Sequence, residues 1–140
     1  MKTDLTKIMS VSGHHGLFRY LAQSRTGVIA EALSDGKRVA FDAHSRISTL
    51  SDIAIYTSEG EMKLQDVLVA LKNSGLDVPS AKAPQSEVVA FFGNAIPNYD
   101  SDRFYYSHMK KVLDWYAEID KYASFDFVTD EDREKEVEQD

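Results

Sequence analysis

The hydrophobic pattern of this chain changes near Glu59–Met62, and the change limits the folds open to it. Before this point, apolar residues alternate with polar ones between turn signals, which is the pattern of β-strands. After it, apolar residues recur every three or four positions, which is the pattern of amphipathic helices. The sequence therefore predicts an α+β protein with a β module at residues 1–60, a helical module at residues 61–123 and an acidic, flexible tail at residues 124–140.

Turn signals divide the β module into short strands. The expected strands are Ile8–Val11, Leu17–Gln23, Val28–Leu33, Arg38–Ala43 and Ile53–Tyr56. Asp35-Gly36 separates two apolar-rich runs, and this dipeptide is typical of a tight hairpin turn because glycine accepts a positive φ. Five short strands within the β module favour a strongly bent sheet. We therefore predict a five-stranded SH3-like barrel, since closure removes exposed sheet edges.

The helical module is expected to contain three helices. Their core-facing stripes are Leu64, Val67, Leu68 and Leu71 in the first, Val88, Val89, Phe92 and Ile96 in the second, and Met109, Val112, Leu113, Tyr116 and Ile119 in the third. Ser86 and Ser107 are the predicted N-caps of the second and third helices, because a serine side chain can accept a hydrogen bond from the first helical turn.

The third helix carries a second apolar stripe beside the first. It consists of His108, Trp115, Ile119 and Tyr122, and it widens the apolar face to about 180° of the helix. We expect one side of this helix to pack on the other helices and the second side on the barrel. A module of about 60 residues buries only about 60% of its unfolded surface, so size favours an interface shared by the two modules. In the alternative, Trp115 and Tyr122 belong to a partner or homodimer surface, because aromatic residues anchor interfaces.

Composition excludes several classes of protein. There is no cysteine, so disulfides and thiolate metal sites are impossible. No apolar run approaches the roughly 20 residues that cross a bilayer, and no apolar stretch of a secretory signal follows Met1. We therefore expect a cytoplasmic protein without a membrane partner. Residues 124–140 carry eight acidic and two basic side chains, which is typical of a solvated tail.

Motifs for catalysis or for a cofactor do not emerge from the sequence. The four histidines, His14, His15, His44 and His108, lack the spacing of a metal site. Gly13 and Gly16 bracket a turn, but the Lys-Ser/Thr of a phosphate-binding loop does not follow. No serine stands in a nucleophile motif. The sequence predicts a non-enzymatic protein that uses neither a metal nor another cofactor.

Binding is the remaining class of function, and the leading hypothesis is an adaptor that engages another protein. The predicted partner-binding residues are His14, His15 and Arg46 on the barrel loops and His108, Trp115 and Tyr122 on the last helix. The alternative is RNA or single-stranded nucleic acid bound by the basic residues Arg19, Arg25, Lys37 and Arg38. The acidic tail would oppose a polyanion, so a protein partner is preferred.

Several segments resemble one family in the same order along the chain. They are Lys7–Gly13, Gly16–Tyr20, Asp35–Arg38, Ser51–Thr57 and Lys110–Tyr116. The chain from about residue 5 to residue 122 resembles a small bacterial family of unknown function from Bacteroidota. That resemblance implies an N-terminal SH3-like β domain followed by a helical C-terminal domain. It implies no activity, ligand or site residue.

Overall fold

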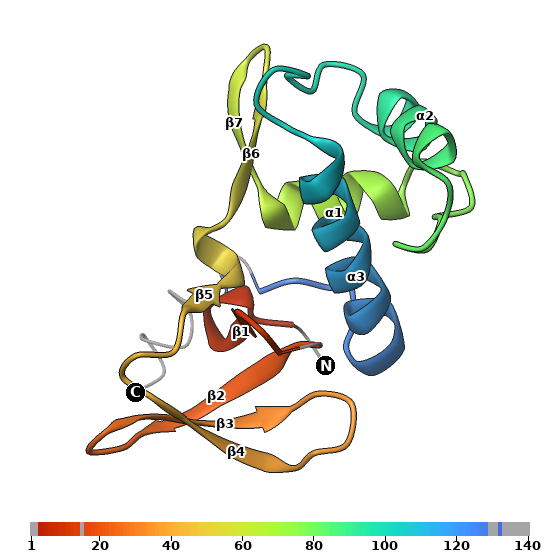
Figure 1. Ribbon diagram of the computed structural model, residues 1–140. Coiled ribbons are helices and arrows are strands. Elements are labelled where there is room, and N and C mark those ends of the chain that lie inside the picture. Colours follow the sequence, from red (N-terminus) through yellow and green to blue (C-terminus); the bar gives the residue numbers. More distant parts are fainter. Residues whose placement is uncertain (1–2, 15, 129–131, 133–140) are drawn as a thin grey trace.

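In the computed structural model, which describes residues 3–14, 16–128 and 132, a five-stranded antiparallel sheet lies against a helical region (Figure 1). The strands are β1 (Ile8–Val11), β2 (Phe18–Gln23), β3 (Gly27–Ala32), β4 (Arg38–Asp42) and β5 (Ile47–Thr49). Their order is β4-β3-β2-β1-β5, with every neighbouring pair antiparallel. Two short 3-10 helices, η1 (Leu5–Lys7) and η2 (Leu50–Asp52), precede β1 and follow β5.

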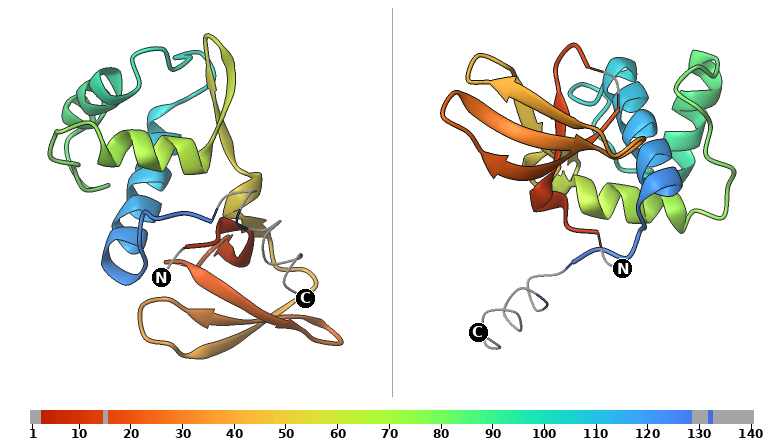
Figure 2. Two further views of the ribbon diagram at one scale, coloured as in Figure 1. Left: turned by 180° about the vertical axis from the view of Figure 1, so that it is seen from behind. Right: turned by 90° about the horizontal axis from the view of Figure 1, so that it is seen from below.

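A second, two-stranded sheet leads from η2 into the helices. Strands β6 (Ala54–Thr57) and β7 (Gly60–Lys63) form a hairpin that pairs with no strand of the larger sheet in the described part of the chain. The helices after this hairpin are α1 (Leu64–Lys72), α2 (Gln85–Ala95) and α3 (Tyr106–Tyr122). The right-hand view of Figure 2 shows α3 between the larger sheet and α2, while α1 begins next to η2 and the hairpin.

The α+β class is confirmed, but the predicted closure of the sheet into a barrel is not. The first four predicted strands agree with β1 to β4 to within one residue at each end. The predicted fifth strand, Ile53–Tyr56, corresponds to β6 and belongs to the separate hairpin. The actual fifth strand, β5, has three residues and is too short to show a period. Among the described residues, β4 and β5 are the two edges of an open sheet.

The helix predictions are confirmed in number and place for the described residues, and wrong at two N-termini. The residue before α2 is Pro84 rather than Ser86, and the residue before α3 is Tyr105 rather than Ser107. Pro84 is tolerated there because the first turn of a helix makes no use of the missing N–H. In α2 the buried stripe contains Phe91 where Val89 was expected, and Val89 is only partly buried.

One large hydrophobic cluster joins the sheet to the helices. From the sheet side it includes Leu5, Ile8, Leu17 and Leu50, each at most 3% exposed, and from the helices it includes Leu64, Leu68, Phe92, Leu113 and Ile119. A smaller cluster, Met9, Val11, Phe18, Ala30 and Phe41, lies within the sheet. Successive residues of a strand point to opposite faces. In β1, Ile8 therefore faces the large cluster, and Met9 and Val11 face the small one.

The start of the predicted tail is anchored beside the N-terminus. Thr3 N–H donates to the carbonyl of Asp126 at 2.8 Å, and Val128 N–H donates to the carbonyl of Thr3 at 2.9 Å. Phe127 is buried in the large cluster. Residues 124–128 thus belong to the folded body. The rest of the predicted tail, apart from residue 132, lies outside the described residues.

Tyr116 on α3 provides a pH-dependent test of this packing. Burial, and to a smaller extent the nearby Asp120 carboxylate, raises the pKa of the Tyr116 phenol above its ordinary value of 10.0. Above about pH 10 the unfolded chain releases this proton before the folded chain does, so folding stability falls as pH rises through that range. The free energy of unfolding, measured by urea denaturation at pH 8 and pH 10.5, should fall less in Tyr116→Phe than in the wild type. The exposed Tyr20→Phe is the control, and equal losses in all three proteins would contradict the prediction.

Candidate functional site

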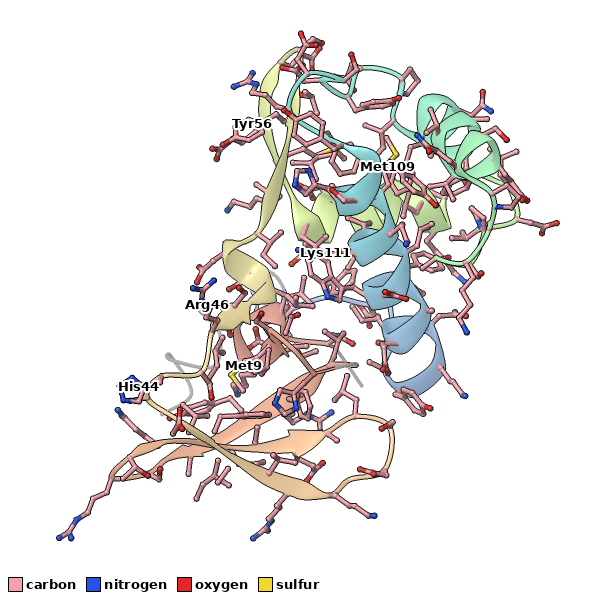
Figure 3. All side chains as sticks on the ribbon, viewed as in Figure 1. Met9, His44, Arg46, Tyr56, Met109 and Lys111 are labelled. Carbon is pink, nitrogen blue, oxygen red and sulfur yellow. The ribbon has the colours of Figure 1, made fainter. Side chains whose placement is uncertain are left out.

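A cleft of about 440 Å³ lies between the larger sheet and α3, and we call it the seam cleft. Its strand wall is Ser10, Val11, Ser12, Arg46 and Ser48, its turn residues are Gly13, His14 and Gly16, and its helix wall is Lys111, Asp114, Trp115 and Glu118, with Ile53 between the walls. Figure 3 labels one residue from each wall, with Arg46 on the strand side and Lys111 on α3. The cleft therefore lies where the two halves of the protein meet.

The strand wall of the seam cleft is polar because of the alternation within β1 and β5. Ser10 pairs with Ser48 in the register, and Ser12 N–H donates to the carbonyl of Arg46 at 2.9 Å. Since Met9 and Val11 point into the small cluster, Ser10 and Ser12 point to the opposite face, toward α3. An apolar strand face would pack directly on the helix. Small hydroxyl side chains leave an open, water-accessible space instead.

The helix wall is one stripe of α3. Lys111, Asp114, Trp115 and Glu118 follow the i, i+3, i+4, i+7 spacing that places side chains on one helix face. Trp115, the sole tryptophan of the chain, is partly buried there. At the end of the stripe Glu118 packs against Gly16, where an added Cβ would lie 2.6 Å from Oε1 of Glu118. Gly16 also has a φ of +88°, so both its backbone conformation and its close approach to α3 favour glycine.

Most of the charged groups in the seam cleft are not used in ion pairs. Within the part of the chain that the structure describes, Arg46, Lys111 and Asp114 make none, whereas Arg19 pairs with Glu31 at 3.8 Å outside the cleft. Glu118 differs from these three residues, because it already has an interaction partner. The cleft thus presents two cations and one carboxylate that are available to a ligand.

A second cleft of about 290 Å³ adjoins the first along α3, and we call it the hairpin cleft. It is lined by Ile53, Ala54, Ile55, Tyr56, Arg103, Phe104, His108, Lys111, Val112 and Trp115. Three of these residues, Ile53, Lys111 and Trp115, also line the seam cleft. The two clefts therefore adjoin, a polar one beside β5 and a more apolar one beside β6, and we refer to the pair as the groove.

Arg103 is held in place at the rim of the hairpin cleft. Its Nε donates to Oδ2 of Asp100 at 2.8 Å, and its guanidinium lies 4.4 Å from the centre of the Tyr56 ring. The hydrogen bond from Arg103, with a further one from the N–H of Asp102, holds the pKa of Asp100 below its ordinary range. Arg103 and Tyr56 thus lie together at the rim of the hairpin cleft.

The structure brings some of the predicted partner-binding residues together and separates others. His14, Arg46 and Trp115 line the seam cleft, and His108 lines the hairpin cleft. Nδ1 of His108 also accepts a hydrogen bond from Tyr105 N–H at 3.1 Å, so this ring stabilises the start of α3. Tyr122, at the end of α3, lines neither cleft. His15 lies outside the described residues.

Sequence reasoning missed the serines and Lys111. Ser10 and Ser12 alternate with Met9 and Val11, which is a detectable signal for one polar strand face. That signal does not say which element faces the strand, so a cleft was not predictable from it. Lys111 belongs to neither apolar stripe of its helix and was not among the predicted binding residues, whereas it lines both clefts.

The predicted nucleic-acid residues do not form one cluster. Arg19 and Arg38 flank Glu31 in neighbouring strands, and Arg19 forms an ion pair with it. Lys37 adjoins Arg38, but Arg25 lies in the turn before Gly27, about 13 Å away along β3. Two aromatic rings of this sheet, Phe18 and Phe41, are buried and cannot stack on bases.

The described residues were also compared with the requirements of a metal site and of a membrane-spanning helix. No three His, Asp or Glu side chains of the described residues lie close enough together to hold a metal ion. In the same part of the chain, every helix is too short or too polar to cross a bilayer.

Each half of the chain matches a known protein family. Residues 5–50 match the domain of unknown function DUF5606, and residues 53–119 match the domain of unknown function DUF6852. These matches meet at η2, before the hairpin, whereas the sequence pattern placed the division at residue 60. No curated protein matches the chain.

A solved structure is also similar. It is the solution NMR structure of a structural-genomics target from Bacteroides vulgatus, with 35% sequence identity and a TM-score of 0.69. The similarity covers 82% of this chain and 84% of that chain. These matches confirm the resemblance to a protein of unknown function from Bacteroidota. The chain belongs to the same family as the Bacteroides vulgatus protein and joins a DUF5606 domain to a DUF6852 domain.

Proposed function

We propose that this protein is a non-enzymatic binding module that holds an extended segment of a partner protein in the groove along α3. The observation that carries the proposal is the continuity of the seam and hairpin clefts through Ile53, Lys111 and Trp115. Two adjoining clefts along one helix suit a chain segment better than a compact small molecule, which is usually enclosed on most sides.

The residues of the groove have the composition of a protein-binding site. Trp115, Tyr56 and Arg103 belong to the residue types that contribute most to the binding energy of protein interfaces. Arg103 already contacts Asp100 and Tyr56, which reduces the side-chain entropy that it would lose on binding.

Selection from a random peptide library tests the proposal. Because Trp115 is the sole tryptophan, binding of tryptophan-free peptides is read from its fluorescence. Ser48→Tyr places a large ring in the seam cleft and should weaken the selected peptides at least about tenfold, since a blocked groove loses the central contacts. Ser34→Tyr makes the same change on the exposed turn between β3 and β4, and it should leave binding unchanged.

Two results would contradict the proposal. If no selected peptide changes Trp115 fluorescence, or if both tyrosine variants bind equally well, the groove is not the binding site. Retention of single-stranded RNA that Arg38→Ala weakens and Ser48→Tyr leaves intact would instead favour the nucleic-acid alternative.

A further inference from the structure

We infer that the segment held in this groove is acidic, with carboxylates that meet Arg46 and Lys111 and an apolar side chain that enters the hairpin cleft. This inference rests on the proposed function and specifies the chemistry of the partner. Its basis is the set of charges left available in the groove and the change of polarity along the length of the groove.

The two cations stand on opposite walls of the seam cleft. Arg46 comes from the strand side and Lys111 from α3, and neither makes an ion pair with any described residue (Figure 3). An arginine presents a planar set of donors that suits a carboxylate, and the hydroxyls of Ser10, Ser12 and Ser48 add donors on the same wall. A carboxylate that enters the cleft therefore meets positive charge on one side and positive charge with hydroxyl donors on the other.

The acidic residues of the cleft must be weighed against these cations. Glu118 is already engaged, and it packs against Gly16 two helical turns, or about 10 Å, beyond Lys111. Asp114 is the one carboxylate that opposes an acidic ligand, and it lies one turn from Lys111 toward Glu118. Arg103, at the far end of the groove, is neutralised by Asp100. The lining of the seam cleft thus carries two cations and two carboxylates, of which Glu118 already has an interaction and Asp114 makes no ion pair with a described residue. Lys111 lies on the side nearer the hairpin cleft.

The hairpin cleft determines which kind of side chain the partner carries beside its acidic residues. Beyond Lys111 the lining is mainly apolar, with Ile53, Ile55, Phe104, Val112 and Trp115. Burying an apolar side chain there removes nonpolar surface from water on both partners. We therefore expect carboxylates in the seam cleft and an aliphatic or aromatic side chain one or two positions away in the hairpin cleft.

Three eight-residue peptides of one design test the inference. Each carries two central leucines and lacks tryptophan, and the flanking residues are glutamate in the first, glutamine in the second and lysine in the third. Trp115 fluorescence should show that the glutamate peptide binds at least about tenfold tighter than the lysine peptide, with the glutamine peptide between them. Added salt should reduce this difference, because it screens exposed charges. Replacing both leucines with glycine should weaken the glutamate peptide about tenfold.

Charge variants of the cleft residues test the inference from the protein side, with the neighbouring Lys110 as the control. Arg46→Ala and Lys111→Ala should each weaken the glutamate peptide about fivefold, and Asp114→Asn should strengthen it. Lys110→Ala removes the same charge one position earlier on α3, where the side chain lies over Tyr106 and outside both clefts, so it should change little. The double variant Arg46→Glu with Lys111→Glu should bind the lysine peptide in preference.

The outcomes separate this inference from the proposed function. If glutamate and lysine peptides bind equally and Ser48→Tyr blocks both, the acidic preference is wrong and the groove remains a peptide site. If Lys110→Ala weakens the glutamate peptide as much as Lys111→Ala does, the charge effect is not local to the groove and the inference fails. If none of the three peptides binds, the inference is also wrong, and the random library, which does not depend on charge, decides the proposed function.

Discussion

Replacing Gly27 with alanine is expected to cost about 3 kcal/mol of folding stability or more, enough to leave little folded protein at 37 °C. Gly27 begins β3 and pairs with Asp42 of β4. An added Cβ would lie 1.8 Å from the carbonyl oxygen of Phe41 and 2.8 Å from the Asp42 backbone. Because these contacts are with main-chain atoms, no side-chain rotation relieves them, and the two strands must separate. Thermal and urea denaturation measure the loss.

Alanine replacements at two other glycines separate the effect of this clash from the effects of backbone strain and helix propensity. Gly36 has a φ of +72° and no atom within 4 Å of an added Cβ, so Gly36→Ala should cost only the strain of a left-handed residue, about 1–2 kcal/mol. Gly93 is an exposed residue of α2 with open space around it, and Gly93→Ala should stabilise the protein by about 1 kcal/mol. A loss for Gly27→Ala no larger than that for Gly36→Ala would show that the strands adapt to the methyl group.

Residues 1–60 expressed alone are expected not to form a cooperatively folded domain. Leu5, Ile8, Leu17 and Leu50 are almost fully buried in the cluster that they share with the helices. Removing the helices exposes part of each of these four side chains, at up to about 2 kcal/mol each. The upper total, about 8 kcal/mol, is comparable to the whole stability of a typical small protein.

Heteronuclear NMR of the fragment measures this directly. We expect poorly dispersed amide signals and no sharp thermal transition for residues 1–60, with dispersed signals for the full chain under the same conditions. Co-expression of residues 61–140 is the matched control, because a shared core should let the two pieces fold together. A fragment that melts cooperatively with the stability of the full chain would show that the sheet does not depend on the helices.

Local chemistry made much of the secondary structure predictable. β1 to β4 are short, apolar-rich runs that end at glycine or polar turns, so their bounds follow from the sequence. β5 and β7 were not predicted, because Ile47-Ser48-Thr49 and Gly60-Glu61-Met62-Lys63 are too short or too polar to show a period. β7 extends the strand region to Lys63, and α1 begins at Leu64, the first residue of the predicted helical stripe.

The candidate site was partly predictable for a different reason. Trp115 and Arg46 were candidates because of their residue types and their place on the last helix and a sheet loop. Whether these two residues face each other across a cleft depends on the angle between α3 and the sheet. Ser10 and Ser48 likewise line a cleft only because α3 lies opposite them. The same limit explains the barrel prediction, since strand count does not determine whether the edge strands β4 and β5 pair.

The walls of the seam cleft come from different family domains: Ser10, Arg46 and Ser48 lie in the DUF5606 region, and Lys111 and Trp115 in the DUF6852 region. Each domain on its own would present only one wall of the cleft. Under the proposed function, a partner in the cleft would contact both domains at once, so its binding would depend on their being joined. Loss of either domain would remove one wall, and the proposed role therefore needs both on one chain.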